Sequence, residues 1–366
     1  MTTPARALAA ALVFSLPAVA FAAEEGEDSA LPLPELSGYV QGRFVWDEQS
    51  THDRVTDGFT VRRARLKLEW LGEHGGVVLQ IDGSPRGVTL RDAEARLKMP
   101  LLGGLELSVG QMKWPFGYEV LQSSQERELP ERSRAFRAFF SNERDRGARL
   151  RGKAGIVRFS GGVFDGNGID ARGFVGRDND RYKDVVGRVG VELGAVSGGV
   201  SGWYGQTVRA LEDGEAEIPA TERTFDRTRL GADLQVKLTP WGDRETALKL
   251  EAVRGRTYWR DGAEQFGLPA WGGYALLTQE LPWRNTIAVR YDVFDGLLGT
   301  ADVAMPGDAT RPERTNAVHT LGFAVVHAPH EKLKLTAAYE LPMTGGPDGA
   351  LDPRDNVFTL QLQASY

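Results

Sequence analysis

Residues 59–70 read FTVRRARLKLEW, and this stretch decides the fold because its side chains alternate in character. The apolar positions are Ala64, Leu66, Leu68 and Trp70, and the charged positions between them are Arg63, Arg65, Lys67 and Glu69. Successive side chains of a β-strand point to opposite faces of the sheet. Strict alternation therefore predicts a strand that has one apolar face and one face in contact with water.

The same period of two recurs along most of the chain, for example in residues 93–98, 148–153 and 228–237. We count about sixteen such segments, each close to the ~10 residues that a tilted membrane-spanning strand needs. Short glycine-containing turns alternate with longer polar stretches, which is the layout of outer-membrane barrels. The longer stretches are residues 166–184, 209–224, 256–267, 299–316 and 343–355.

The N-terminus has the composition of a secretory signal peptide. Arg6 precedes an apolar run, and small residues ending at Ala20 and at Ala22 offer two cleavage sites. We expect residues 1–22 to be removed and residues 23–366 to form one barrel domain. A membrane anchor is the alternative, but the run is shorter than the ~18 apolar residues that span a bilayer.

Period two alone does not distinguish a soluble β-sandwich from a membrane barrel, because both folds have one apolar face per strand. Export, the number of strands and the dense charges of both signs favour a barrel with a water-filled interior. No later segment is apolar enough for a transmembrane helix, and only helices and closed barrels satisfy their backbone inside lipid. We predict an all-β fold, a transmembrane antiparallel β-barrel of about 16 strands surrounded by the lipid of the bacterial outer membrane.

The composition argues against several classes of function. The chain has no cysteine, so we expect neither disulfides nor a thiolate metal site. The formal net charge of −6 gives no reason to expect nucleic acid as a partner. Neither Gly-x-Ser-x-Gly nor His-Glu-x-x-His occurs among the 366 residues. We therefore predict no catalytic site, no metal site and no cofactor.

Residues 357–366 form the last predicted strand. Its apolar face consists of Phe358, Leu360, Leu362, Ala364 and the terminal Tyr366. A chain that ends on an aromatic residue at the close of an amphipathic strand resembles the signal that the barrel-assembly machinery recognises in outer-membrane proteins. Phenylalanine or tryptophan is the usual last residue of that signal, and tyrosine is a milder variant.

Alternation stops between residues 117 and 145. A long irregular segment inside a compact fold is usually functional. This segment is densely charged, and Phe136, Phe139 and Phe140 supply apolar anchors for packing against a barrel wall. We predict a constriction loop that folds into the barrel and narrows its interior. The alternative is a surface loop that projects outward.

Three motifs resemble the phosphate-selective porin O/P family. They are residues 59–66 (FTVRRARL), residues 110–119 (GQMKWPFGYE) and residues 155–168, which end in GGVFDGNG. The resemblance implies a trimeric porin of 16 strands, with a constriction loop in the pore and with phosphate or polyphosphate among its solutes. It does not assign phosphate-binding residues to positions in this chain.

Basic side chains on the polar faces are candidates for an anion pathway. A guanidinium group stays charged and presents a fork of donors that matches phosphate and carboxylate oxygens, and rings of such groups line anion-selective pores. The pore-lining candidates are Arg63, Arg65, Lys67, Arg96, Lys98, Lys113, Arg149, Arg151, Lys153 and Arg158. The constriction-loop candidates are Arg127, Arg132, Arg134 and Arg137.

These observations predict an outer-membrane porin through which small anionic solutes diffuse passively, assembled as a homotrimer as the resemblance implies. Glu69, Asp92 and Glu94 lie on the same polar faces and favour a second interpretation, a general porin with little selectivity. Less favoured alternatives are an outer-membrane barrel enzyme and a structural or adhesin barrel whose interior is plugged.

Overall fold

The computed structural model describes most of the chain after residue 32. The described residues are 33–53, 55–84, 87–100, 104–141, 143–169, 180–209, 219–260, 263–296, 317–344 and 355–366. The predicted signal peptide, residues 1–22, lies outside them, as do residues 299–316 of the expected polar loops. None of the helices in the described part of the chain has the length and apolar content that a membrane crossing requires.

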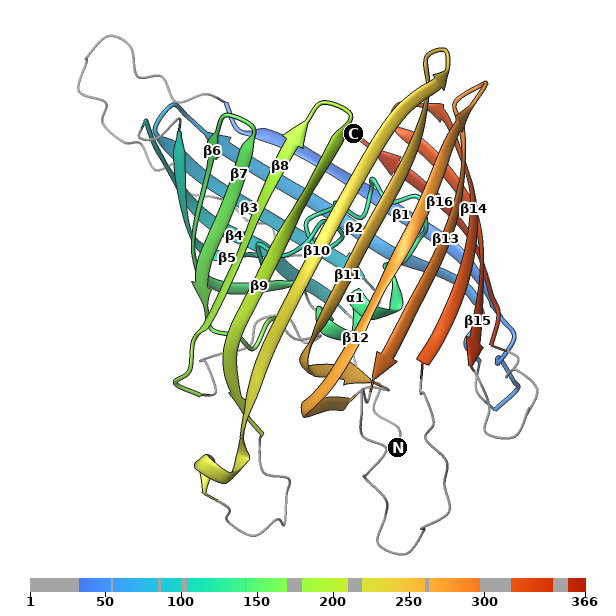
Figure 1. Cartoon of the computed structure of the whole chain (residues 1–366). Helices are drawn as coiled ribbons and strands as arrows, with labels where there is room; N and C mark the ends of the chain where they lie inside the picture. Colours follow the sequence, from blue (N-terminus) through green and yellow to red (C-terminus); the bar gives the residue numbers. More distant parts are fainter. Residues whose placement is uncertain are drawn as a thin grey trace, which may run out of the picture.

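Sixteen strands of the described residues form one closed antiparallel barrel (Figure 1). The first eight are β1 (Glu35–Asp47), β2 (Gly58–Leu71), β3 (Gly75–Ser84), β4 (Gly87–Met99), β5 (Leu105–Lys113), β6 (Arg144–Ala154), β7 (Val157–Phe164) and β8 (Asp184–Leu193). The others are β9 (Val196–Val208), β10 (Thr224–Trp241), β11 (Arg244–Arg260), β12 (Ala263–Leu281), β13 (Asn285–Gly296), β14 (Ala317–His330), β15 (Leu333–Thr344) and β16 (Val357–Ser365). Each strand pairs with its neighbours in sequence, and β16 closes the barrel by pairing with β1. The predicted fold class is confirmed.

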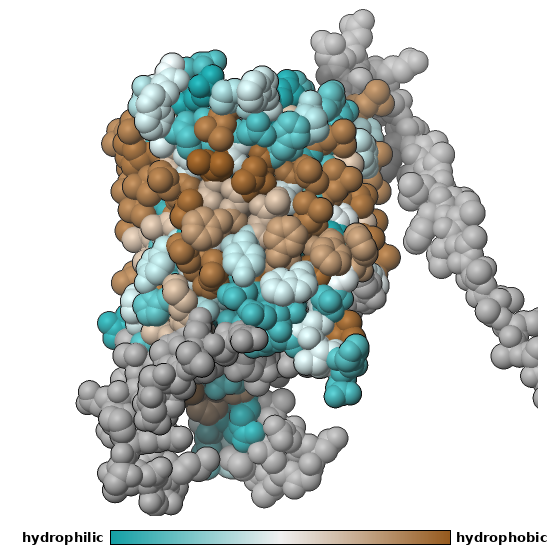
Figure 2. All heavy atoms as spheres, turned by 90° about the vertical axis from the view of Figure 1, so that its right-hand side faces the viewer, coloured by the Kyte–Doolittle hydropathy of each residue, from teal (hydrophilic) through white to brown (hydrophobic). Residues whose placement is uncertain are grey.

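The apolar faces of the strands point out of the barrel. Leu230 on β10 is 70% exposed, whereas Gln41 on β1 is fully buried inside. Figure 2 shows apolar side chains across the middle of the face in view, with hydrophilic side chains gathered above and below them. A soluble sandwich would bury these apolar side chains, so the orientation of the strands is that of a membrane barrel.

Two β-bulges break the regular alternation on neighbouring parts of the wall. Gln41 and Gly42 of β1 pair with Arg63 and Val61 of β2, which leaves Arg62 as the extra residue. A bulge reverses the side-chain parity on either side of it. Phe59 and Val61 therefore point outward before the bulge, and Leu66 points outward after it, although the two sets have opposite parity.

The second bulge has the same arrangement on the next pair of strands. Gln80 and Ile81 of β3 pair with Asp92 and Leu90 of β4, so Arg91 is the extra residue. Both bulges thus place an additional arginine next to a polar residue that already faces the barrel interior.

One expected loop is partly strand. Residues 256–267 were predicted to be a polar loop, but β11 continues to Arg260 and β12 begins at Ala263. The pairing of these strands shifts at Thr257, which has a φ of 64°. The two strands continue to pair beyond this irregularity. The polar composition of residues 256–267 is that of a loop, so it does not indicate these strand ends.

The segment after β5 folds into the barrel and carries α1 (Arg134–Phe139), which packs against β11, β12 and β13 (Figure 1). Phe136, Phe139 and Phe140 are buried in an aromatic cluster. The ring of Phe139 lies 6.3 Å from that of Phe294 on β13, and the ring of Phe140 lies 5.9 Å from that of Trp203 on β9. The predicted inward fold of this segment is therefore confirmed, and the outward surface loop is excluded.

Candidate functional site

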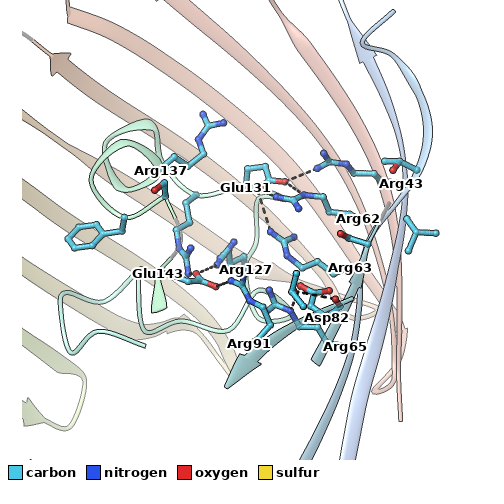
Figure 3. A pocket seen from close by; sticks show the side chains of 17 residues that line it. Arg43, Arg62, Arg63, Arg65, Asp82, Arg91, Arg127, Glu131, Arg137 and Glu143 are labelled. Carbon is cyan, nitrogen blue, oxygen red and sulfur yellow. Dashed lines mark hydrogen bonds and ion pairs between the residues drawn. The ribbon is translucent and has the colours of Figure 1, made fainter. Parts of the chain in front are cut away.

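A cavity of about 580 Å³ lies between the inner face of β1–β4 and the inward-folded segment (Figure 3). We call it the arginine pocket, because eight arginines and only three carboxylates line it, a formal excess of five positive charges. The lining residues are Arg43, Thr60, Val61, Arg62, Arg63, Arg65, Asp82, Ser84, Thr89, Arg91, Arg127, Glu131, Arg132, Arg137, Phe140, Ser141 and Glu143.

The wall arginines of the pocket come from three strands. Arg43 lies on β1, Arg63 and Arg65 lie on the regular inner face of β2, and the two bulges add Arg62 and Arg91. Arg62 and Arg91 were not among the predicted site residues, because strict period two assigns them to the apolar faces. The available signal is the pair of adjacent polar residues, Arg62 before Arg63 and Arg91 before Asp92, inside an otherwise alternating strand.

Glu131 of the inward segment faces three wall arginines. Its carboxylate accepts hydrogen bonds from Nη1 of Arg43 at 2.8 Å and from Nε and Nη2 of Arg62 at 2.6 and 3.1 Å. Nη2 of Arg63 lies 3.5 Å away. Burial alone would raise the pKa of Glu131, but the guanidinium groups of Arg62, Arg63 and Arg43 outweigh burial and hold the pKa well below its usual value. Glu131 is therefore an ionised partner of the wall.

Glu143 closes the other end of the pocket, in a left-handed backbone conformation with a φ of 51°. Its carboxylate accepts a hydrogen bond from Arg91 at 3.0 Å and forms ion pairs with Arg132 and Arg144. Burial would raise its pKa, yet Arg132 and Arg144 overcome that effect, and the pKa of Glu143 lies well below its usual value. The ion pairs tie the segment to β4 and to the start of β6.

Further contacts fix the segment to the barrel on several sides. Oγ of Ser124 shares a hydrogen bond of 2.5 Å with the hydroxyl of Tyr39 and accepts one of 2.9 Å from Arg65. On the opposite wall, Glu251 of β11 accepts the backbone N–H groups of Tyr118 at 2.7 Å and Glu119 at 2.9 Å. The segment is thus a fixed wall of the pocket.

The structure divides the predicted site residues into two groups. Five of them line the arginine pocket: Arg63, Arg65, Arg127, Arg132 and Arg137. Arg134 lies outside it, where its backbone N–H donates to Asp292 at 3.4 Å. Lys113 also lies outside the pocket lining, and its Nζ donates to the carbonyls of Leu121 at 3.0 Å and Gln122 at 2.9 Å.

The remaining candidates lie outside the pocket lining, and most of them pair with carboxylates. Lys67 contacts Glu69 at 2.6 Å, Arg149 contacts Glu94 at 3.2 Å, Arg151 contacts Glu106 at 2.8 Å, Arg158 contacts Glu192 at 2.6 Å, and Arg96 pairs with Glu94. Lys98 donates to the carbonyl of Gly72 at 3.0 Å, and Lys153 is exposed. The excess positive charge is therefore concentrated at the arginine pocket, whereas most of the predicted pore-lining residues outside it are neutralised by carboxylates.

Comparison with known proteins gives a family match and a fold match. The model of the family described as phosphate-selective porin O and P matches residues 35–189. No curated protein matches the chain. Among the solved structures that resemble it are three outer-membrane proteins, whose sequence identities of 10–12% bear on the fold alone.

The trimer form of the outer-membrane protein OmpT of Vibrio cholerae is 10% identical with a TM-score of 0.59, and the match covers 91% of this chain and 99% of that one. An anion-selective porin from Comamonas acidovorans is 12% identical with a TM-score of 0.57, at the same coverages of 91% and 99%. OmpF of Salmonella typhi, in complex with daunomycin, is 10% identical with a TM-score of 0.62, and the match covers 91% of this chain and 97% of that one.

The matched family span includes β1–β7, the inward-folded segment and every residue that lines the arginine pocket. The resemblance to the phosphate-selective porin O and P family is thereby confirmed over residues 35–189, on a chain whose barrel as a whole has the porin fold.

Proposed function

We propose that this protein forms a water-filled channel in the bacterial outer membrane through which small anionic solutes diffuse passively. The observation that carries the proposal is the arginine pocket, with its eight arginines and three carboxylates between the barrel wall and the inward segment. Clefts with low-dielectric walls and charges of one sign concentrate ions of the opposite sign. Arginine rings are a known basis of anion selectivity in pores.

The inward segment supplies the narrowing that selectivity needs. A wide pore lets ions keep their hydration shells, beyond close reach of the wall charges, whereas a constriction brings them near the guanidinium groups. Residues 117–145 act as this constriction loop, with Arg127, Arg132 and Arg137 on the side that faces the wall arginines. The family match supports phosphate among the solutes, and polyphosphate is the related solute that we also propose.

Export, assembly and insertion are part of the same proposal. Residues 1–22 direct secretion, the last strand engages the barrel-assembly machinery, and the mature chain forms a homotrimer in lipid. One structure with a similar fold, that of OmpT from Vibrio cholerae, is a trimer form, which supports this oligomeric state. The family and the fold point to a channel rather than to an enzyme.

The alternative of a general porin with little selectivity has a specific basis in the ion pairs of Arg149, Arg151 and Arg158, which neutralise the row of basic residues outside the pocket. The measurement that separates the two functions is the zero-current potential of single channels in a gradient of potassium chloride across a planar bilayer. A sign that corresponds to preferred chloride passage is expected, and a potential near zero would favour the general porin.

A pair of charge reversals sharpens this measurement. Arg137 is exposed in the pocket, and no ion pair of Arg137 is seen with the described residues, so Arg137→Glu should move the zero-current potential toward cations. Arg151→Glu is the matched control, because Arg151 lies outside the pocket lining and pairs with Glu106. Equal effects of the two variants would show that the pocket does not control selectivity.

A further inference from the structure

We propose that Glu131 is a tethered counter-anion, which occupies an oxyanion-binding site formed by Arg43, Arg62 and Arg63 and sets how tightly the channel holds a permeating oxyanion. This inference rests on the proposed channel function, and it assigns Glu131 as a specificity-determining residue of the arginine pocket. The chemical class of the ligand is a small oxyanion, a carboxylate or a phosphate, because the site already holds a carboxylate.

The geometry of the contact is that of a ligand in a site. Three guanidinium groups from the adjacent strands β1 and β2 converge on the carboxylate of Glu131, which the inward segment carries, as Figure 3 shows. Arg62 binds both oxygens of Glu131, at 2.6 and 3.1 Å, which is the bidentate arrangement typical of strong arginine–oxyanion recognition. A free carboxylate or phosphate can satisfy the same donors.

The backbone around Glu131 is held from the far side of the barrel. Its carbonyl accepts a hydrogen bond of 2.8 Å from Arg290 on β13. The side chain therefore extends from a fixed point toward β1 and β2. A solute that takes its place at the arginines displaces only a side chain, and the segment stays where it is.

Exposure separates Glu131 from the other two carboxylates of the pocket. The side chains of Glu131 and Arg43 are each 19% exposed, and that of Arg62 is 35% exposed. Glu143 is 6% exposed and its ion pair with Arg144 is buried, while Asp82 is held by Arg65 at 2.9 Å. Glu131 is thus the pocket carboxylate that an entering solute can best compete with.

Competition from a tethered carboxylate has a useful consequence for a channel. A side chain fixed beside its site acts at a high effective concentration, so it lowers the apparent affinity for a free competitor. Conduction requires that binding be weak enough for the solute to leave. Three unpaired arginines would retain an oxyanion strongly, and Glu131 offsets this retention by returning to the site as the solute departs.

The test compares Glu131→Gln with Glu128→Gln in the full-length mature protein. Glu128 lies on the same segment and pairs with Lys249 on β11, so this control removes the same charge without touching the pocket. Single-channel chloride current is measured while sodium phosphate or sodium succinate is added. We expect the half-blocking concentration of at least one probe to fall about tenfold in Glu131→Gln, equivalent to ~1.4 kcal/mol, and to stay unchanged in Glu128→Gln.

Arg43→Gln supplies a second readout, since removing one of the three donors should raise the half-blocking concentration of the same probe. An unchanged or higher half-blocking concentration for both probes in Glu131→Gln would overturn the inference, as would an equal fall in Glu128→Gln. The proposed channel function fails differently: the wild-type protein would then carry no anion-selective current at all. If Glu131→Gln does not fold, an unchanged block in Arg43→Gln overturns the inference.

Discussion

Arg62 and Arg91 are the extra residues of two separate β-bulges, and both line the same pocket. A bulged residue stands outside the regular pairing of the ladder, and the local bend of its strand re-aims the side chain. The chain uses this device twice, on β2 and on β4, to raise the density of positive charge at one level of the barrel.

The bulged arginines should contribute to selectivity without holding the barrel together. Arg62→Gln and Arg91→Gln are each expected to lower the anion-to-cation permeability ratio by about fivefold, which corresponds to ~1 kcal/mol of lost attraction. The zero-current potential measures this ratio. Arg158→Gln is the control, because Arg158 lies away from the pocket and pairs with Glu192 at 2.6 Å. A drop of the same size in the control would argue for a diffuse effect of net charge.

Gly117 should be required at the start of the inward segment. Its φ is 58°, and a methyl group there would collide with Oε1 of Glu251, the acceptor for the backbone of Tyr118. Gly155 has the same φ of 58°, yet a methyl group there would meet no atom within 4 Å. Both substitutions to alanine carry the backbone cost of ~1 kcal/mol.

The excess destabilisation of Gly117→Ala over Gly155→Ala therefore reports the collision alone. We expect Gly117→Ala to unfold at a lower temperature in detergent and to show noisier open-channel current, because the segment loses its tie to β11. Tryptophan fluorescence during heating and single-channel recording measure the two effects. Equal unfolding temperatures would mean that Glu251 moves aside at little cost.

Phe139 should anchor α1. Its ring lies 6.1 Å from that of Tyr258 and 6.3 Å from that of Phe294, and the side chain is buried. Phe139→Ala is expected to lower the free energy of unfolding by ~3 kcal/mol or more, as large-to-small changes in a packed cluster do. Phe59→Ala is the matched control, because Phe59 is 89% exposed on the outer face. Guanidinium unfolding in detergent gives both free energies.

The ion pairs of Glu143 should resist mild acid. Its pKa is held well below the usual value by Arg132 and Arg144 against the effect of burial, which favours the neutral form. A carboxylate whose pKa is lowered on folding contributes full stability above its unfolded pKa of ~4.5. That contribution is lost only as the pH falls through the lower, folded value.

The difference in unfolding free energy between the wild-type protein and Glu143→Gln should therefore stay constant from pH 8 to about pH 5 and shrink only at lower pH. Its size at neutral pH should be ~3 kcal/mol or more, because the substitution leaves the buried guanidinium of Arg132 without its carboxylate partner. A difference that already shrinks between pH 7 and pH 5 would mean that the carboxylate has an ordinary pKa.

The sequence predicts the barrel well because a period of two depends on local geometry alone. The stretch of residues 64–70 alternates without interruption, and in the structure it pairs with β3 without a register shift, with Arg65 buried and Leu66 and Trp70 exposed. The inward segment is also predictable, since loss of alternation and the three phenylalanines are visible in the sequence. Both features belong to contiguous stretches of chain.

The pocket is less predictable because it depends on register. Arg62 and Arg91 reach the interior only through shifts in pairing with β1 and β3. Arg149 on β6 forms an ion pair with Glu94 on β4, and β5 lies between these two strands. No local sequence pattern predicts that Glu94 is its neighbour. Charge balance inside a barrel is a property of strands that meet in space, so counting basic residues along the chain overestimates the positive surface.

The arginine pocket is encoded within the first 143 residues, whereas residues that support its inner wall, Glu251, Arg290 and Phe294, lie on strands made later. The residues that select the solute and the residues that support the inward segment therefore lie in different parts of the chain. Exchanging the early strands for those of another 16-stranded barrel would remove the arginine pocket. Exchanging the later strands would keep the residues of the pocket but remove the contacts that support the inward segment. Substitutions within one contiguous stretch can therefore change which solute the pocket selects, provided that the later strands keep their contacts with the inward segment.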